Sequence, residues 1–121
     1  MIIALPVEED KGLDSHIYEH FGRAPIYVLV HVKDNEIVKV ESIENPYIYE
    51  HPRGIIPKLL ADRKVDVVIC RGIGFRARDV LSEYGIKVVT GAEGRVGDLV
   101  KAYINGSLKS VDYTPPERWR R

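Results

Sequence analysis

The stretch Val65-Asp66-Val67-Val68-Ile69-Cys70-Arg71-Gly72-Ile73-Gly74 decides the fold of this chain. Its first six residues are largely apolar and predict a strand buried on both faces of a sheet. The two glycines then break the strand, and an amphipathic helix begins at Phe75. A further apolar run, residues 86–90, follows that helix. Strands joined by a helix normally run parallel in a right-handed crossover, so we expect an α/β protein.

The N-terminal part of the chain predicts three more strands. Residues 2–7 form a second buried run, with Pro6 near its end because proline has no N–H to donate. Residues 26–32 and 37–43 are two strands separated by a polar break at Asp34-Asn35. Asp and Asn tolerate the left-handed backbone that a tight hairpin requires. We therefore expect strands 1–3 to form an antiparallel meander.

Three helices complete the predicted order β-β-β-α-β-α-β-α. They span residues 55–63, 75–84 and 96–104, and the first begins close to Ile56 because Pro57 fits only in a first turn. If strands 4 and 5 run parallel to strand 1, the result is a mixed five-stranded sheet of ribonuclease H-like architecture. We expect one domain over residues 1–109 and a C-terminal tail, residues 110–121, that is mobile or peripherally packed.

The composition of the 121 residues narrows the class of protein. At 45% hydrophobic, the chain can build a core without disulfides. Its single cysteine excludes an internal disulfide framework and a multi-cysteine zinc site, and fits a reducing cytoplasm. No signal peptide or membrane-length apolar run is seen. The 18 basic residues balance 18 acidic ones, which makes nucleic-acid binding an unfavoured function. The 30% share of charged residues leans toward a thermophile.

Four loops are predicted to meet at one edge of the sheet. They follow strands 1, 3, 4 and 5 and span residues 8–25, 44–54, 71–74 and 91–94. Because these strands run parallel, the loops leave the carboxyl edge, where α/β proteins bind ligands. The residues that we expect to contact a ligand there are His20, Phe21, Gly22, Arg23, His51, Arg53, Arg71, Gly72 and Gly74.

Three features of these loops have a structural as well as a functional interpretation. The turn at residues 71–74 precedes a helix whose N–H groups favour an anion, yet a tight turn alone also requires glycine. It lacks the third glycine of a dinucleotide site and the Gly-Lys-Ser/Thr of a P-loop. His20 is either a metal or cluster ligand or a solvated loop histidine. Cys70 is either a metal ligand or a buried, inert thiol.

No catalytic constellation emerges from the sequence, so we expect a protein that is not an enzyme. Asp14, Ser15 and His16 are adjacent along the chain, which does not make a triad, and no nucleophile elbow is present. A two-metal nuclease of ribonuclease H-like fold needs a carboxylate on strand 1, and residues 2–7 contain none.

Several segments resemble the dinitrogenase iron–molybdenum cofactor biosynthesis family, the NifX-like proteins. They are the N-terminal strand through Pro6-Val7, Leu13-Asp14-Ser15, Glu19-His20-Phe21-Gly22-Arg23-Ala24-Pro25, Glu44-Asn45-Pro46, Val67-Val68-Ile69 with Gly72-Ile73-Gly74, Gly85-Ile86-Lys87-Val88, and the last helix. The resemblance covers about residues 1–108 and is most specific at residues 20–24. It implies a ribonuclease H-like fold and the transient binding of iron–sulfur or iron–molybdenum cofactor precursors. Cys70-Arg71 departs from the family pattern, in which a small residue is frequent.

These observations lead to one expectation and one alternative. The expectation is a non-catalytic carrier of an iron–sulfur or iron–molybdenum-type cluster precursor, with His20 as the first candidate ligand and Cys70 or His51 as the second. Arginines 23, 53 and 71 would offset the negative charge of the cluster. Its partners would be the cofactor and the proteins that donate and accept it. The alternative is a regulatory domain that binds a small molecule or nucleotide at the same loop edge.

Overall fold

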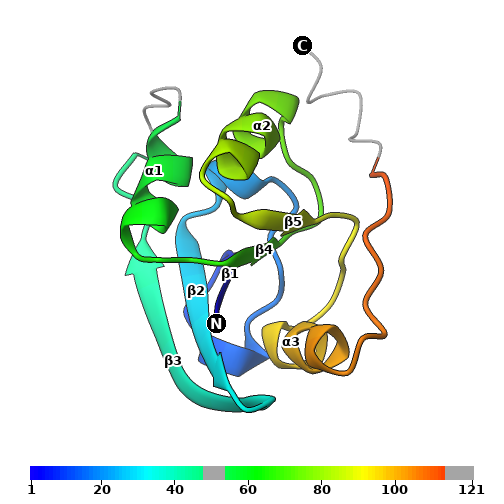
Figure 1. Ribbon diagram of the computed structural model, residues 1–121. Coiled ribbons are helices and arrows are strands. Elements are labelled where there is room, and N and C mark those ends of the chain that lie inside the picture. The colour runs from blue at the N-terminus through cyan, green and yellow to red at the C-terminus, as the bar shows by residue number, and fades with distance from the viewer. Residues whose placement is uncertain (48–53, 114–121) are drawn as a thin grey trace.

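The computed structural model describes residues 1–47 and 54–113 and contains one five-stranded mixed sheet (Figure 1). The sheet has the order β3-β2-β1-β4-β5. The strands are β1 (Ile2–Val7), β2 (Ile26–Lys33), β3 (Glu36–Glu44), β4 (Val67–Ile69) and β5 (Lys87–Val89). β1 pairs antiparallel with β2 and parallel with β4, while β3 is antiparallel to β2 and β5 is parallel to β4. The predicted meander and the two parallel strands are confirmed; the ribonuclease H-like assignment stays a prediction.

The parallel strands are shorter than the apolar runs that predict them. β4 pairs with β1 through Ile3 and Ala4 alone. Val65 instead closes the preceding helix, because its N–H donates to Leu60 O at 3.1 Å. Cys70 lies beyond the strand, although its N–H still donates to Val89 O at 2.9 Å. Both ends of the predicted strand are therefore used in its connections to the neighbouring elements.

The β2–β3 hairpin has the turn that the sequence predicts. Asp34 and Asn35 have φ values of 53° and 63°. Two consecutive left-handed residues are the geometry of a two-residue hairpin turn, and Lys33 pairs with Glu36 across it. The turn lies at the sheet edge opposite the carboxyl ends of β1, β4 and β5.

Three helices cover the two faces of the sheet (Figure 1). They are α1 (Ile55–Asp62), α2 (Phe75–Glu83) and α3 (Val96–Ile104). The helices α1 and α2 cover one face and α3 covers the other, so the domain has three layers. Two 3₁₀ turns, η1 (Gly12–Asp14) and η2 (Phe21–Arg23), lie in the loop after β1. No helix in residues 1–47 or 54–113 has the length and apolar character needed to cross a membrane.

Each face of the sheet has its own hydrophobic core. The core under α3 is built from alternate strand residues such as Ile3, Leu5 and Val7 together with Val96 and Val100. The core under α1 and α2 takes the residues that point the other way, including Ala4, Tyr27, Val68, Leu60 and Leu81. Side chains of β1 alternate between the two cores because successive strand residues face opposite sides. As the central strand of the sheet, β1 thus contributes side chains to both cores.

The first four residues of the predicted C-terminal tail pack against the end of β5. The N–H of Val111 donates to Thr90 O at 3.0 Å, and the Thr90 N–H donates to Ser110 Oγ at 3.0 Å. Residues 110–113 are thus tied peripherally to the domain. The remainder of the predicted tail, residues 114–121, lies outside the described residues.

Candidate functional site

The loops after β1 and β4 are hydrogen-bonded to each other at the carboxyl edge of the sheet. His20 and Gly72 form a parallel bridge. The Phe21 N–H donates to Gly72 O at 3.0 Å, and the Gly72 N–H donates to Glu19 O at 3.1 Å. Two segments about fifty residues apart in sequence therefore form one continuous backbone surface, as the strand directions require.

The other two loops join the same edge. The Gly91 N–H, after β5, donates to Arg71 O at 2.9 Å, and the Ile17 N–H donates to Gly94 O at 2.9 Å. At the start of the loop after β3, the Asn45 side chain donates to Ala24 O at 2.9 Å. The predicted meeting of four loops at one edge is borne out for their described parts. His51 and Arg53 lie outside the described residues.

A hollow of about 210 Å³ lies at this edge between the β4–α2 turn and the residues after β5. It is lined by Arg71, Gly72, Ile73, Arg78, Thr90, Asp112 and Tyr113. Two arginines and one aspartate therefore line the same small space. Thr90 is 5% exposed, and its hydroxyl donates to Val111 O at 2.7 Å, so this hydroxyl holds the wall together.

Arg71 is the best-positioned charge of the hollow. Its Nη1 lies 3.2 Å from Glu93 Oε2, and its Cζ lies 4.6 Å from the centre of the Tyr113 ring. The Arg71 side chain is 28% exposed, whereas that of Glu93 is 77% exposed. The carboxylate therefore approaches Arg71 from solvent, while the aromatic ring supports it from the protein.

Tyr113 connects Arg71 to the loop after β1. Its hydroxyl donates to Glu19 Oε2 at 2.7 Å. Burial, and next the hydrogen bond to this carboxylate, raise the pKa of Tyr113 above 10.0. The phenol therefore stays protonated at neutral pH and acts as a donor.

His20 lies at the predicted edge, but its ring folds back over its own loop. A Cβ placed on Gly22 would stand 3.7 Å from His20 Cε1, which is ordinary van der Waals contact. The Nδ1 atom of the ring is shielded from solvent. A ligand that reaches His20 in this conformation therefore does not meet Nδ1 directly.

Phe21 anchors the loop and does not face a ligand. Its side chain is 1% exposed, and its ring lies 5.5 Å from that of Tyr27 at an angle of 58°. The buried Tyr27 hydroxyl donates to Phe21 O at 2.6 Å. Arg23, two residues later, is exposed at the end of η2. The His-Phe-Gly-Arg stretch thus divides into an anchor and solvent-facing parts.

Cys70 is buried below the edge. It is 0% exposed, and its Sγ contacts Val89 O at 3.6 Å. Burial raises the pKa of the thiol to about 12, although the nearby Arg78 charge works against this effect. The thiolate is the metal-binding form, so the structure favours the inert interpretation of Cys70. Among the described residues, no group of three His, Cys, Asp or Glu side chains is placed to hold a metal ion.

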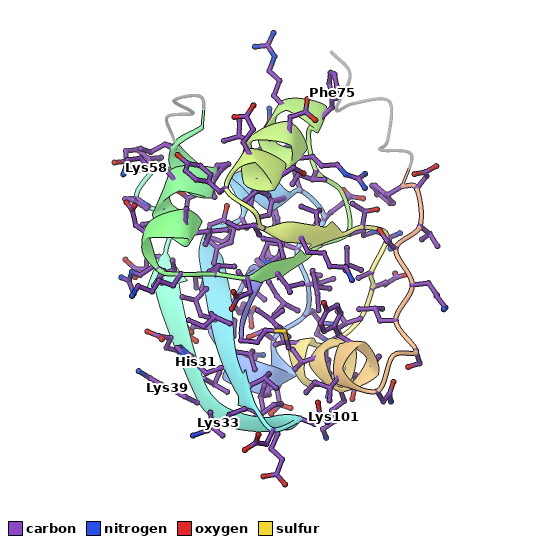
Figure 2. The ribbon with its side chains drawn as sticks, viewed as in Figure 1. His31, Lys33, Lys39, Lys58, Phe75 and Lys101 are labelled. Atoms are coloured by element: carbon purple, nitrogen blue, oxygen red, sulfur yellow. The ribbon has the colours of Figure 1, made fainter. Side chains whose placement is uncertain are left out.

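Gly74 is the N-cap residue of α2, and among the described residues no side chain makes a capping hydrogen bond there. Phe75, the first residue of α2, is 77% exposed and points away from the domain beside this edge (Figure 2). Ser15 follows η1 as its C-cap residue. Its Oγ accepts from the Lys11 N–H at 2.8 Å and donates to Glu9 O at 2.9 Å.

A second, larger groove of about 560 Å³ lies along the loop after β1. It is lined by Glu8, Glu9, Lys11, Asp14, Ser15, His16 and Arg95. Lys11 is paired with Glu9 at 2.9 Å, and Arg95 Nε donates to His16 Nε2 at 3.3 Å. Because three carboxylates line this groove, it is less suited to an anion than the hollow at Arg71.

Comparison with known protein families decides the assignment. The sequence model described as "Dinitrogenase iron-molybdenum cofactor" matches residues 1–106. The chain belongs to this family. The region matched by the dinitrogenase iron-molybdenum cofactor family includes all three helices and all five strands. It ends before Asp112 and Tyr113, which line the hollow.

Several known proteins are similar to this chain over nearly their whole length. The protein PH0822, known from a crystal structure, is 38% identical with a TM-score of 0.83, over 93% of this chain and 97% of that one. The Methanocaldococcus jannaschii protein MJ0580 is 28% identical over 93% of this chain and 92% of its own length. The apo orange protein of Desulfovibrio gigas is 24% identical with a TM-score of 0.81, over 95% and 96%, and shows the same fold.

Sequence reasoning identifies Arg71, Gly72 and the position of His20, but it misses several residues of the hollow. These are Arg78, Asp112 and Tyr113, together with Glu19 and Glu93 around them. A signal for Arg78 exists, because residues four apart share one face of a helix and Arg78 stands four residues after Gly74. No periodic pattern marks Asp112 and Tyr113.

Proposed function

We propose that this protein is a non-catalytic carrier that binds an anionic metal–sulfur cluster precursor at the hollow beside Arg71. The observation that carries the proposal is that Arg71 and Arg78 line one small hollow together with the backbone of Gly72. Gly72 is hydrogen-bonded to the loop that holds His20. Membership of the dinitrogenase iron-molybdenum cofactor family supports a cofactor-related cargo.

The charges of the hollow are suited to reversible binding of an anion. Glu93 pairs with Arg71 from an exposed position, and exposed ion pairs contribute only about 0–1 kcal/mol. An incoming anion therefore displaces Glu93 at little cost and gains two guanidinium groups. A carrier that must later release its cargo benefits from such a weakly protected site.

The donor set favours a preassembled cluster over one built on the protein. A stably held iron–sulfur cluster normally takes four cysteine ligands, and this chain has one, which is buried. Charge and hydrogen bonds would thus supply most of the binding. His20, on the neighbouring loop bridged to Gly72 and not in the lining of the hollow, is the proposed direct ligand. In the cell the cargo would pass between donor and acceptor proteins in a reducing cytoplasm.

Binding of tetrathiomolybdate, a molybdenum–sulfur dianion, under anaerobic conditions tests this proposal. Wild-type protein should retain its visible absorption through gel filtration. Arg71→Gln and Arg78→Gln should each weaken binding about tenfold, the loss of one charge-assisted hydrogen bond. His20→Ala should weaken the absorption band, and Cys70→Ser should leave it intact because the thiol is buried.

Controls separate the hollow from general charge effects. Arg63 pairs with Glu41 at 3.8 Å on another part of the surface, so Arg63→Gln should bind like wild type. His31→Ala is the matched control for His20. A wild-type protein that takes up neither tetrathiomolybdate nor a cluster formed from ferrous iron and sulfide would reject the carrier function.

A regulatory domain is the second candidate function, and the size of the hollow is the observation that favours it. About 210 Å³ is smaller than the roughly 300–1,000 Å³ of typical ligand pockets, so it accommodates one phosphate group held by two arginines. Thermal shift against nucleotides and phosphorylated metabolites, without any metal, separates the two functions. Stabilisation by such a ligand, combined with no uptake of metal–sulfur anions, would favour the regulatory role.

A further inference from the structure

The residues Ser110–Tyr113 form a short strap across the end of β5. The Val111 N–H donates to Thr90 O at 3.0 Å, and the Thr90 hydroxyl donates to Val111 O at 2.7 Å. Gly91, the next residue, approaches the strap so closely that a Cβ there would stand 2.2 Å from Val111 Cγ2. The strap is therefore fitted to the edge of the sheet at the place where the hollow opens.

Tyr113, at the end of the strap, bridges two loops of the candidate site. Its hydroxyl donates to Glu19 Oε2, one residue before His20, and its ring lies 4.6 Å from the Arg71 guanidinium carbon. The ring also lines the hollow, as does the neighbouring Asp112. One side chain thus contacts the anion-binding arginine and fixes it relative to the loop of His20.

The Tyr113 ring supports the Arg71 guanidinium, and a hydrogen-bond interaction with the Tyr113 hydroxyl uses part of its donor set. The cation contacts the ring through its flat face, whereas its five N–H groups point outward in the guanidinium plane. Glu93 pairs with Nη1 of Arg71 at 3.2 Å, and because its side chain is exposed, an anion from solvent can replace it. The ring therefore orders the Arg71 side chain in advance and lowers the entropy that an anion must offset on binding.

We infer that Tyr113 is a positioning residue of the anion site, acting through Arg71. The inference rests on the proposed binding of an anion at this hollow. It goes beyond the family match, which ends at residue 106. Because the strap lies outside the region that the family model matches, the family match by itself assigns no role to Tyr113.

Tyr113→Ala, Tyr113→Phe and Tyr84→Ala test this inference by titration calorimetry with two probes, inorganic phosphate and tetrathiomolybdate. Loss of the stacked ring in Tyr113→Ala should weaken binding by roughly 2- to 30-fold, the range expected for one cation–π contact. Tyr113→Phe keeps the ring but loses the hydroxyl contacts to Glu19 and Arg71, so it should lose less affinity than Tyr113→Ala. Tyr84, half-exposed at the end of α2, is the matched control, and its variant should bind unchanged.

A second readout follows the stack without any ligand. The Tyr113 ring should shift the NMR signals of the Arg71 side chain, and this ring-current shift should persist in Tyr113→Phe and disappear in Tyr113→Ala. A structural role alone would lower the thermal midpoint of Tyr113→Ala while leaving its affinity at the wild-type value. That result would overturn the inference, as would equal losses of affinity in the Ala and Phe variants.

The two probes keep this inference distinct from the proposed function. If wild type binds phosphate but no metal–sulfur anion, and Tyr113→Ala weakens the phosphate affinity, the carrier function fails while the positioning role stands. If wild type binds neither probe, there is no anion for Arg71 to receive, and the positioning role is rejected as well.

Discussion

Glu41, on β3, is surrounded by three basic side chains. Its Oε2 lies 2.5 Å from His31 Nε2 and 3.8 Å from Lys39 Nζ, and its Oε1 lies 3.8 Å from Arg63 Nη1. His31 and Lys39 lie close together on this side of the sheet in Figure 2. The hydrogen bond with His31 first, and the attraction of Lys39 and Arg63 next, hold the pKa of Glu41 below its ordinary value of 4.5.

This lowered pKa predicts an acid-dependent loss of stability. Because the carboxyl group binds its proton less readily when folded than when unfolded, its stabilising effect is present above about pH 4.5 and is lost as the pH falls through the folded-state pKa. At neutral pH, Glu41→Gln should lower the free energy of unfolding by up to about 1 kcal/mol, since the group is partly exposed. The gap from wild type should narrow below pH 4.

Urea unfolding between pH 3 and pH 7 measures this effect. Glu44 is an exposed carboxylate on the same strand, and Glu44→Gln is the matched control that should show little change across the range. A constant difference between wild type and Glu41→Gln at every pH would contradict the assignment of the lowered pKa to the folded state.

Burial of single residues is easier to predict from the sequence than the direction of a ring. Cys70 ends an apolar strand run, and its predicted burial is confirmed at 0% exposure. His20 and Phe21 have similar surroundings in the sequence, yet Phe21 enters the core while the His20 ring folds over Gly22. The Phe21 ring contacts Tyr27, whose hydroxyl donates to Phe21 O, and such core contacts are not a property of the sequence pattern.

At the scale of elements, the contact between the β5 loop and the strap predicts an effect of Gly91→Ala. Gly91 has φ = 77°, which disfavours alanine, and a Cβ there would also meet Val111 O at 2.8 Å. The variant should lose stability and release the strap, because the backbone of Val111 must move away. Amide hydrogen exchange at Val111 should therefore accelerate strongly.

Gly85→Ala isolates the backbone term in that experiment. Gly85 has φ = 79°, but nothing lies within 4 Å of a Cβ placed there. This variant should cost roughly 1–2 kcal/mol, the penalty of a left-handed backbone for alanine, and leave exchange at Val111 unchanged. If Gly91→Ala protects Val111 as well as wild type does, the close fit between the loop and the strap is wrong.

Most element positions could be predicted because their signals are local. The hairpin at Asp34-Asn35 and the helix at residues 96–104 depend on turn chemistry and on periodicity, and both are confirmed. The parallel strands are shorter than their apolar runs because tertiary hydrogen bonds, such as that of Val65 to Leu60, take the terminal residues. Pairings between distant segments decide such boundaries, and the local sequence does not record them.

At the scale of the whole molecule, β1 carries both cores and should dominate stability. Leu5 is 0% exposed in the core under α3, whereas Val38 on the edge strand β3 is 60% exposed. Leu5→Ala should lower the free energy of unfolding by about 2–5 kcal/mol. Val38→Ala should change it by less than about 0.5 kcal/mol. Chemical denaturation of both variants provides the measurement, and equal costs would contradict a central β1.

The general location of the candidate site could be predicted, but its walls could not. Strand directions alone bring the loops of His20, Arg71 and Gly91 to one edge, and the hydrogen bonds between those loops bear this out. Tyr113 contacts Glu19 across 94 positions of sequence, and the strap has no periodic pattern to announce it. The long-range contacts of an irregular segment depend on the shape and the polar groups of the folded surface against which it packs.

The turn at Asp34-Asn35 offers a practical handle on this protein. The turn is exposed, and its conformation depends on two residues with left-handed backbone. It lies at the edge of the sheet opposite the loops that carry Arg71 and His20. Exposed loop tips of this kind accept insertions and chemical attachment most readily. A fluorophore or a surface tether placed at this turn would leave the hollow facing solution, so immobilised protein would present its arginines to any donor or acceptor passed over it.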